Sequence, residues 1–323
     1  MADSKWKSAL LRSGVPLEHD VARFLTNEGF YISPDFEFHR VSEGVEKEFS
    51  VDLDGTFYGH PDRLDYTLHI LAECKYRSPE KSLLLFEETN PEMGGTLGGT
   101  LTVSDQFVPF YARFEPIAEF ERQFPFAYKA VELHEGSAVE RDIKHGLAQL
   151  KYATPSFVVD HVVRSLFEHE EDRHPNFFAS LLITNAPLRL VDSETSLDQV
   201  NAAAALTDIT TEVPWAVISH GIGPEYRAHV GRVVQAFDRE ELIEKAEEVE
   251  KHVISGGKKN VLYSAHPVNF TEGILSGGYE LTSLCSQVFI VNLASMPRFI
   301  GELKAATKAA FRRRLKASRF KSR

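Results

Sequence analysis

Two opposite charges, Glu73 and Lys75, close an apolar run of the sequence. The five residues at 68–72 read LHILA, and such a run predicts a buried strand. Because the charges are two positions apart, their side chains point to the same face of that strand. A carboxylate can hold a divalent cation, and a neighbouring ammonium can orient or activate an attacking water. The pair therefore suits metal-assisted hydrolysis of a phosphodiester, whereas alone it would also fit a surface ion pair at a strand end.

Two acidic residues further upstream could join this pair. Asp52 lies within an alternating run, 47–54, so it is a charge embedded in a predicted strand. Glu18 lies beside an apolar stripe with helical spacing, formed by Leu17, Val21, Phe24 and Leu25. Pro16 suits the first turn of that helix, and Gly29 suits its end. The chain thus orders an acidic helix, a strand aspartate and a Glu-x-Lys strand.

This order of elements resembles the PD-(D/E)XK, or restriction-endonuclease-like, nuclease superfamily. The core of that superfamily is a helix, a three-stranded meander, a second helix and a strand. The resemblance covers about residues 14–152. It places Glu18 at the family's acidic helix position, Asp52 at its strand aspartate, and Glu73 with Lys75 at its motif pair.

The next predicted helix, 143–152, continues the resemblance. Several branches of the superfamily carry Gln-x-x-Tyr on this helix, and Gln149 with Tyr152 match it. The resemblance implies that Gln149 orients Lys75 or contacts a phosphate. It also implies that Lys75 positions the attacking water and offsets charge that develops on the phosphorane.

The resemblance implies a nuclease that depends on Mg²⁺ or Mn²⁺ and hydrolyses nucleic acid, with DNA as the first expectation. The implied catalytic residues are Glu18, Asp52, Glu73, Lys75 and Gln149. The implied metal ligands are Asp52, Glu73, the main-chain carbonyl of Cys74, and Glu18 either directly or through water.

The identity of the strand aspartate is open at this stage. If Asp52 pairs across a hairpin with Glu73, the turn falls near Asp62 and Arg63. Asp62 itself is the alternative, because the segment 59–63 resembles the Gly-x-x-Asp-Arg of the exonuclease branch. Pro61 disfavours a central strand there, since it cannot donate to a ladder. Asp54, on the same strand face as Asp52, is a further rival.

The domain organisation follows from the spacing of these residues. About seventy residues separate Lys75 from Gln149, so we expect a large insertion at about 80–135. It includes a glycine-rich stretch at 91–100 and an aromatic-rich one at 108–131. We expect a nuclease-like core within 1–190. Residues 191–323 should form an α/β extension of the same sheet or a small second domain, with strands at 177–185, 213–219 and 288–292 and a helix at 238–250.

Composition sets limits on the class of protein. The chain has 323 residues, 43% of them hydrophobic and 26% charged, as is ordinary for a globular protein. Two cysteines do not suggest a disulfide framework. We see neither a signal peptide nor an apolar stretch of the ~20 residues that a membrane helix needs. These features predict a cytoplasmic protein without a membrane partner, in which Cys74 faces away from Glu73 into the core.

The net charge of −11 opposes nucleic-acid binding, but its distribution is uneven. Residues 301–323 carry nine basic side chains and one acidic one, which is +8 and leaves −19 on the remainder. This basic segment could contact phosphates. Nucleic acid is therefore the expected partner, and a homodimer is left open. Two other interpretations remain: a member of the same fold that binds without cutting, and an unrelated α/β protein with a chance Glu-x-Lys.

Overall fold

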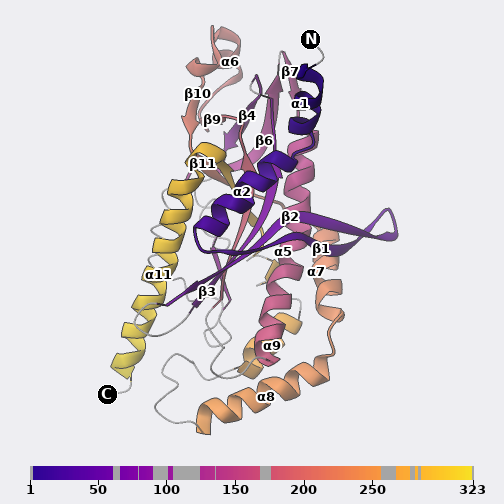
Figure 1. The fold of residues 1–323 in the computed structure, drawn as a ribbon, viewed down its shortest axis with the longest axis vertical. Coiled ribbons are helices and arrows are strands. Elements are labelled where there is room, and N and C mark those ends of the chain that lie inside the picture. The colour runs from indigo at the N-terminus through magenta and orange to yellow at the C-terminus, as the bar shows by residue number, and fades with distance from the viewer. Residues whose placement is uncertain are drawn as a thin grey trace.

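The computed structural model describes residues 3–60, 66–78, 80–89, 101–104, 124–134, 136–167, 176–255, 267–276, 281–282 and 285–321. Over these residues the chain forms one mixed sheet of twelve strands with helices on both of its faces (Figure 1). The order along the sheet is β1-β2-β3-β8-β12-β11-β6-β4-β9-β10, with β5 beside β8 and β7 beside β6. The predicted α/β class is confirmed.

An antiparallel meander begins the sheet. Its strands are β1 (Tyr31–Ser42), β2 (Val45–Gly59) and β3 (Tyr66–Lys75). The β2–β3 ladder sets Leu53 opposite Ala72, so Asp52 and Glu73 follow at the next level. At the other end Gly59 lies opposite Tyr66. A Cβ at Gly59 would overlap the buried ring of Tyr66, so glycine lets the tyrosine ring pack there.

The central strands of the sheet form both parallel and antiparallel pairs. Strand β3 pairs in parallel with β8 (Asn176–Thr184), and β8 pairs in parallel with β12 (Gln287–Asn292). Beyond them lie β11 (Trp215–Ser219), β6 (Phe126–His134), β4 (Ser82–Glu87), β9 (Leu188–Val191) and β10 (Thr210–Val213), with the short strands β5 (Leu101–Ser104) and β7 (Ser137–Val139). Strands before, inside and after the predicted insertion therefore share one sheet, whereas the proposed division near residue 190 stays a prediction.

Helices cover the two faces in separate groups. One face packs against α2 (Val15–Asn27) and α11 (Met296–Lys321), and the other against α5 (Arg141–Phe167), α7 (Pro224–Gln235) and α8 (Arg239–Ser255). The other helices among the described residues are α1 (Asp3–Arg12), α6 (Leu197–Ala202) and α9 (Pro267–Leu275), with the 3-10 turns η3 (Leu206–Asp208) and η5 (Leu293–Ser295). Within the described part of the chain, no helix combines the length and apolarity needed to cross a membrane.

The alternation of β3 assigns its residues to the two faces. Ile70, Ala72 and Cys74 are buried in the cluster that contains α2 and α11, whereas Leu71 is buried in the cluster that contains α5. Glu73 and Lys75 share the parity of Leu71 and therefore point toward α5. Cys74 faces away from them, as predicted.

Local signals of the sequence account for the ends of two helices. Helix α2 follows Gly14, whose φ is 84°, has Pro16 in its first turn, and ends before Gly29, whose φ is 88°. Both glycines occupy the left-handed region that other residues avoid. Helix α8 follows Asp238, whose Oδ1 accepts the N–H groups of Glu240 at 2.9 Å and Glu241 at 3.1 Å. This N-cap was expected from the sequence.

Candidate active site

Three of the predicted residues are in contact where α5 crosses the end of β3. The Lys75 ammonium forms an ion pair with Glu73 Oε1 and approaches Gln149 Oε1 at 3.5 Å. Gln149 Nε2 in turn donates to the carbonyl of Ser50, on β2, at 2.8 Å. Gln149 therefore links the helix, the lysine and the neighbouring strand. Tyr152 instead lies edge-on to the His229 ring on α7, with a centroid separation of 5.1 Å.

A glycine that sequence reasoning missed permits this close packing. A Cβ at Gly146 would lie 2.8 Å from Lys75 Cε and 3.4 Å from Glu73 Cγ. Gly146 precedes Gln149 by three residues, so both lie on the same face of α5. That i, i+3 spacing is the signal that could have identified it. The glycine gives the Glu73–Lys75 pair its room beneath the helix.

Asp52 occupies the adjacent position on β2. Its Oδ2 accepts the main-chain N–H of Cys74 at 2.6 Å, which ties the aspartate to β3. Burial raises the pKa of Asp52, while the Cys74 N–H and the charge of Lys75 oppose that rise. The carboxylate is thus held beside Glu73 with one oxygen engaged by the main chain.

Glu73 is the most deeply buried member of the set. Its exposed fraction is 0%, and its Oε2 has no hydrogen-bond partner within the described residues. Burial raises the pKa of Glu73 to about 7, the ammonium of Lys75 lowers it, and the charge of Asp52 raises it further. A buried carboxylate oxygen without a partner is costly. A cation beside Oε2 would relieve that cost.

Glu18 approaches the set from the start of α2. Its Oε1 lies 3.0 Å from the point that a Cβ of Gly14 would occupy, so the side chain folds back over that glycine. Burial raises the pKa of Glu18, and the charge of Asp52 raises it further, whereas Lys75 lowers it. The carboxylate of Glu18 therefore lies close enough to Asp52 and Lys75 for their charges to act on it.

A further carboxylate, Asp35, was not predicted from the sequence. Pro34 lies opposite Leu53 and Phe36 opposite Val51, which sets Asp35 level with Asp52 on the neighbouring strand. Its φ of 54° is uncommon for a residue other than glycine. The charge of Asp35 raises the pKa of both Asp52 and Glu18. The available signal was an aspartate after a proline within an otherwise strand-like run.

The rivals to Asp52 are separated from this set or lie outside the described residues. Asp62 falls in the segment 61–65, which the structure does not describe. Asp54 shares a strand face with Asp52, but the charges that act on it are those of Arg164 and Asp160, further along α5. It also lines a cavity beneath β1. Asp52, and not Asp54, is therefore the β2 carboxylate beside Glu73.

The donor chemistry of the set suits Mg²⁺ or Mn²⁺, which prefer oxygen ligands. Among the described residues, however, no three His, Cys, Asp or Glu side chains gather closely enough to form a ready metal cage. One oxygen of Glu73 is engaged by Lys75 and one oxygen of Asp52 by Cys74. The carboxylates would have to converge further around an ion.

The arrangement combines carboxylates, one lysine and an amide at the end of a buried strand. Such a group can hold a cation beside a phosphate and place a donor next to the attacking water. A comparison with protein families, characterised proteins and solved structures found no match to this chain. Function must therefore be inferred from the residues and their geometry.

Proposed function

We propose that the protein is a metal-dependent nuclease of the PD-(D/E)XK type that hydrolyses phosphodiester bonds of nucleic acid, with DNA as the first candidate. The observation that carries the proposal is the contact of Lys75 with Glu73 and Gln149, beside Asp52 on the adjacent strand. The element order supports it, because α2, the meander β1–β3, α5 and β8 follow the sequence helix, meander, helix, strand, with β4–β7 inserted between β3 and α5. Strand β8 also pairs in parallel with β3.

The cation would be held by oxygens from β2, β3 and α2 that would converge around it. Glu73, Asp52 and the main-chain carbonyl of Cys74 would hold Mg²⁺ or Mn²⁺, with Glu18 completing the shell directly or through water. When bound, the ion lowers the pKa of a coordinated water and polarises a phosphoryl oxygen. Burial first, and neighbouring carboxylates second, raise the pKa values of Glu18, Asp52 and Glu73. These raised values support the role, since a nearby cation would favour the charged form of each carboxyl group.

The remaining side chains would act on the water and the phosphate. Lys75 donates to the nucleophile and offsets negative charge that develops on the phosphorus oxygens. Gln149 holds the ammonium in place through Oε1, while its amide group stays bonded to the main chain of Ser50. Release of Lys75 from Glu73 would accompany cation binding, because the ion then balances the carboxylate charge.

Metal-dependent stabilisation tests the site before any substrate is known. Titration with Mn²⁺ should raise the melting temperature of the wild-type protein, and Glu73→Gln should abolish that rise. Glu212→Gln is a matched control, because Glu212 is exposed on β10 and belongs to no part of the set. If Glu73→Gln kept the full Mn²⁺ response, the metal assignment would be wrong.

A second function, binding of nucleic acid without cleavage, is favoured by two observations. The described acidic side chains do not form a ready metal cage, and Lys75 already neutralises Glu73. Incubation with circular, linear and single-stranded DNA and with RNA, each with Mn²⁺, separates the two. Cleavage products support the nuclease. Retention of nucleic acid without products supports the binding protein.

A further inference from the structure

Two basic side chains, Arg40 of β1 and Lys151 of α5, approach the ring of Tyr152. The Arg40 guanidinium carbon lies 3.9 Å from the centroid of that ring, and the Lys151 ammonium lies 5.6 Å from it. Such cation–π contacts hold both side chains in place. Lys151 also donates to the carbonyl of Gly221 at 2.8 Å, and no carboxylate within the described residues forms an ion pair with it. Two like charges are therefore fixed around one ring.

One exposed carboxylate, Glu225 at the start of α7, serves both of these cations. Its Oε1 lies 3.7 Å from Arg40 Nη2, which is longer than the roughly 2.8 Å of a direct charge-assisted hydrogen bond. The Tyr152 hydroxyl donates to the same carboxylate. Burial lowers the pKa of Lys151, the charge of Glu225 raises it, and the charge of Arg40 lowers it. Two positive charges thus share one loosely held negative charge, whose side chain is 68% exposed.

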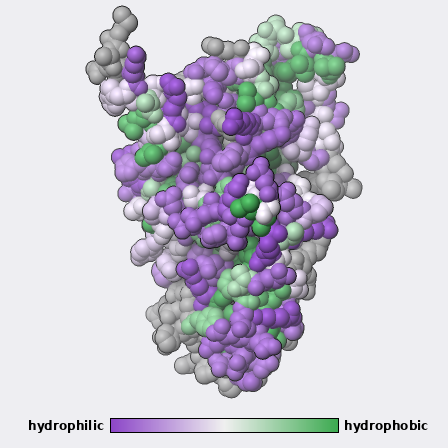
Figure 2. Space-filling view, turned by 90° about the vertical axis from the view of Figure 1, so that its right-hand side faces the viewer, coloured by the Kyte–Doolittle hydropathy of each residue, from purple (hydrophilic) through white to green (hydrophobic). Residues whose placement is uncertain are grey.

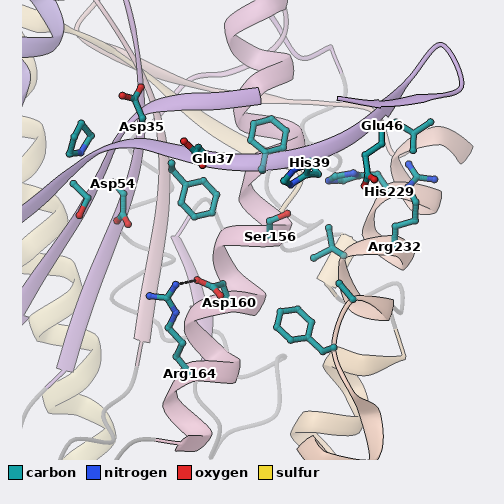
Figure 3. A pocket seen from close by; sticks show the side chains of 18 residues that line it. Asp35, Glu37, His39, Glu46, Asp54, Ser156, Asp160, Arg164, His229 and Arg232 are labelled. Atoms are coloured by element: carbon teal, nitrogen blue, oxygen red, sulfur yellow. Dashed lines mark ion pairs between the residues drawn. The ribbon is translucent and has the colours of Figure 1, made fainter. Parts of the chain in front are cut away.

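A third basic side chain, Arg232 of α7, adds to the positive field around Tyr152. Burial raises the pKa of Tyr152, whereas the charges of Arg40 and Arg232 lower it. Arg232 itself lines the cavity beneath β1, together with Glu46 (Figure 3). It therefore contributes charge from outside the group formed by Arg40, Lys151 and Tyr152. In a chain whose net charge is −11, this group attracts an anion.

The loop from β11 to α7 leaves room and main-chain donors beside Glu225. The helix follows Gly223, which has no side chain to accept its first N–H groups, and these groups have no partner inside a helix. Among the described residues, no atom lies within 4 Å of a Cβ added at Gly221 or at Gly223. The positive end of the helix favours an anion there. Because Lys151 is bonded to this loop through Gly221, the cations and the N–H donors lie at one place.

These donors match a phosphate group better than they match one carboxylate. The guanidinium of Arg40 presents its N–H groups in a plane, and Lys151 adds a point charge. A phosphate group has several oxygens that can accept from both, as well as from the Tyr152 hydroxyl. Glu225 offers two oxygens and one negative charge, so it leaves one of the two positive charges unbalanced. A ligand with more oxygens and more charge would bind in its place.

We propose that Arg40, Lys151 and the Tyr152 hydroxyl form a phosphate-binding site, in which the phosphate group of a ligand displaces the Glu225 carboxylate. The group belongs either to the backbone of a polynucleotide or to a free phosphate ion. The first case rests on the proposed function, and Lys151 lies only two residues beyond Gln149 on α5. The second case stands apart from the proposed function. Neither case requires a metal ion.

Fluorescence anisotropy of a labelled oligonucleotide in EDTA tests the polynucleotide case without cleavage. Arg40→Ala and Lys151→Gln should each weaken binding by at least about fivefold, as expected for the loss of one charged donor. Glu225→Gln should strengthen binding by at least about threefold, because the carboxylate no longer competes with the phosphate. Such a gain of affinity cannot arise from a misfolded variant.

The ion pair between Arg189 and Glu212 supplies matched controls. It measures 3.8 Å, with 21% and 68% of the two side chains exposed, against 22% and 68% for Arg40 and Glu225. Arg189→Ala and Glu212→Gln should leave the affinity for the oligonucleotide unchanged. The measurement uses neither metal nor cleavage. A failure of the nuclease assignment, which is read from cleavage, therefore remains distinguishable from a failure of this site.

Amide chemical shifts in the presence of inorganic phosphate test the free-ion case. Phosphate should perturb the amides of Gly223, Glu225 and Tyr226, and should do so at a lower concentration in Glu225→Gln. These shifts, with an oligonucleotide affinity that is independent of Arg40 and Lys151, assign the site to a free phosphate ion. Affinities for both ligands that are unchanged in folded Arg40→Ala and Lys151→Gln would overturn the proposal. It would also be overturned if Glu225→Gln bound both ligands more weakly, or if the wild-type protein bound neither.

Discussion

At the residue scale, the site concentrates charge where folding alone would avoid it. Glu73 is fully buried at the end of a strand, and only one of its two oxygens is paired within the described residues. Asp35 adopts a backbone conformation that most residues avoid, and its charge acts on Asp52 and Glu18. Features that oppose stability are expected where a ligand uses them. Here that ligand would be a cation.

The pKa of Glu73 predicts how the site affects stability. Its folded pKa, about 7, lies above the ordinary value of 4.5. The stability that this carboxyl contributes is therefore present below about pH 4.5 and is lost as the pH rises through 7. Without metal at pH 8, Glu73→Gln should raise the free energy of unfolding by about 1 to 3 kcal/mol, since it removes a buried charge.

Urea denaturation in EDTA at pH 5 and pH 8 measures this effect. The gain from Glu73→Gln should be larger at pH 8 than at pH 5. Glu73→Gln also removes the ion pair with Lys75, which lowers the gain in the free energy of unfolding. That loss is small, because the Lys75 side chain is 20% exposed and keeps its approach to Gln149. A variant that is less stable than the wild type by the same amount at both pH values would contradict this description of Glu73.

At the element scale, Gly146 lets α5 pack closely over Lys75 and so fixes the position of its ammonium. Gly146→Ala places a methyl group 2.8 Å from Lys75 Cε and 3.2 Å from Leu182 Cδ1, so the lysine must move away from Gln149. The proposed nuclease activity should fall at least tenfold. Stability should change by less than about 1 kcal/mol, because alanine favours a helix by a similar amount that offsets the crowding.

Gly231 provides the matched control for this substitution. It lies inside α7 with nothing within 4 Å of an added Cβ. Gly231→Ala should therefore stabilise the protein by about 0.5 to 1 kcal/mol and leave cleavage unchanged. Parallel denaturation and cleavage assays make the comparison. Equal activity of the two variants would show that α5 does not position Lys75.

Local sequence signals predicted much of the framework around the site. The helix with Glu18, the hairpin with Asp52 and the strand with Glu73 each rest on apolar periodicity, prolines and glycines that act over a few residues. Asp35 and Gly146 were missed because their roles depend on contacts between distant segments. Helix α5 also continues past Pro155 to Phe167, whereas the family resemblance indicated only 143–152.

The order of strands could not be read from the sequence either. Strand β12 lies between β8 and β11, and β6 lies between β11 and β4. These neighbours are set by which buried strands pack best under the helices, and their apolar runs look alike. The glycine-rich stretch 91–100 and residues 108–123 of the aromatic-rich stretch lie outside the described residues.

At the scale of the whole molecule, Lys75 and the helix that carries much of the basic C-terminal segment lie on different faces of the sheet. Lys75 points toward α5, whereas α11, which carries much of the basic segment 301–323, packs on the opposite face. Lys304 on α11 already donates to the carbonyl of Glu28 at 2.8 Å. Figure 2 shows a mostly hydrophilic surface on the side where the β1–β2 hairpin projects. Because the basic helix lies on the other face, a bound metal would supply the positive charge that attracts phosphate to Lys75.

Buried histidines make the stability of the whole molecule depend on pH. His69 lies between Thr56, at 3.0 Å, and Asn176, at 3.1 Å, and is only 4% exposed. Burial lowers the pKa of His69 to about 4, against its hydrogen bond to Asn176, and lowers that of His220 to about 3. Because the unfolded state binds protons below pH 6.5 and the folded state does not, stability is lost as the pH falls from 6.5 toward 4.

Replacement of His69 should flatten that profile. Between pH 6.5 and 4.5, His69→Gln should reduce the pH dependence of the unfolding free energy by about 1.4 kcal/mol per pH unit. The effect on the pH dependence is opposite in sign to that of Glu73→Gln, because Glu73→Gln removes a group whose pKa is raised in the folded state and His69→Gln removes one whose pKa is lowered. His145→Gln, an exposed position on α5, serves as the control. An unchanged slope for His69→Gln would show that His69 takes up protons in the folded state.

The role of Lys75 is the central claim, and cleavage by Lys75→Ala with Mn²⁺ tests it most directly. The variant should lose at least a hundredfold in cleavage rate, on the order of what one transition-state donor contributes, while its Mn²⁺-dependent rise in melting temperature stays close to that of the wild type. The control Lys144→Ala, an exposed lysine on α5, should cut normally. Cleavage by Lys75→Ala at the wild-type rate would contradict the assignment.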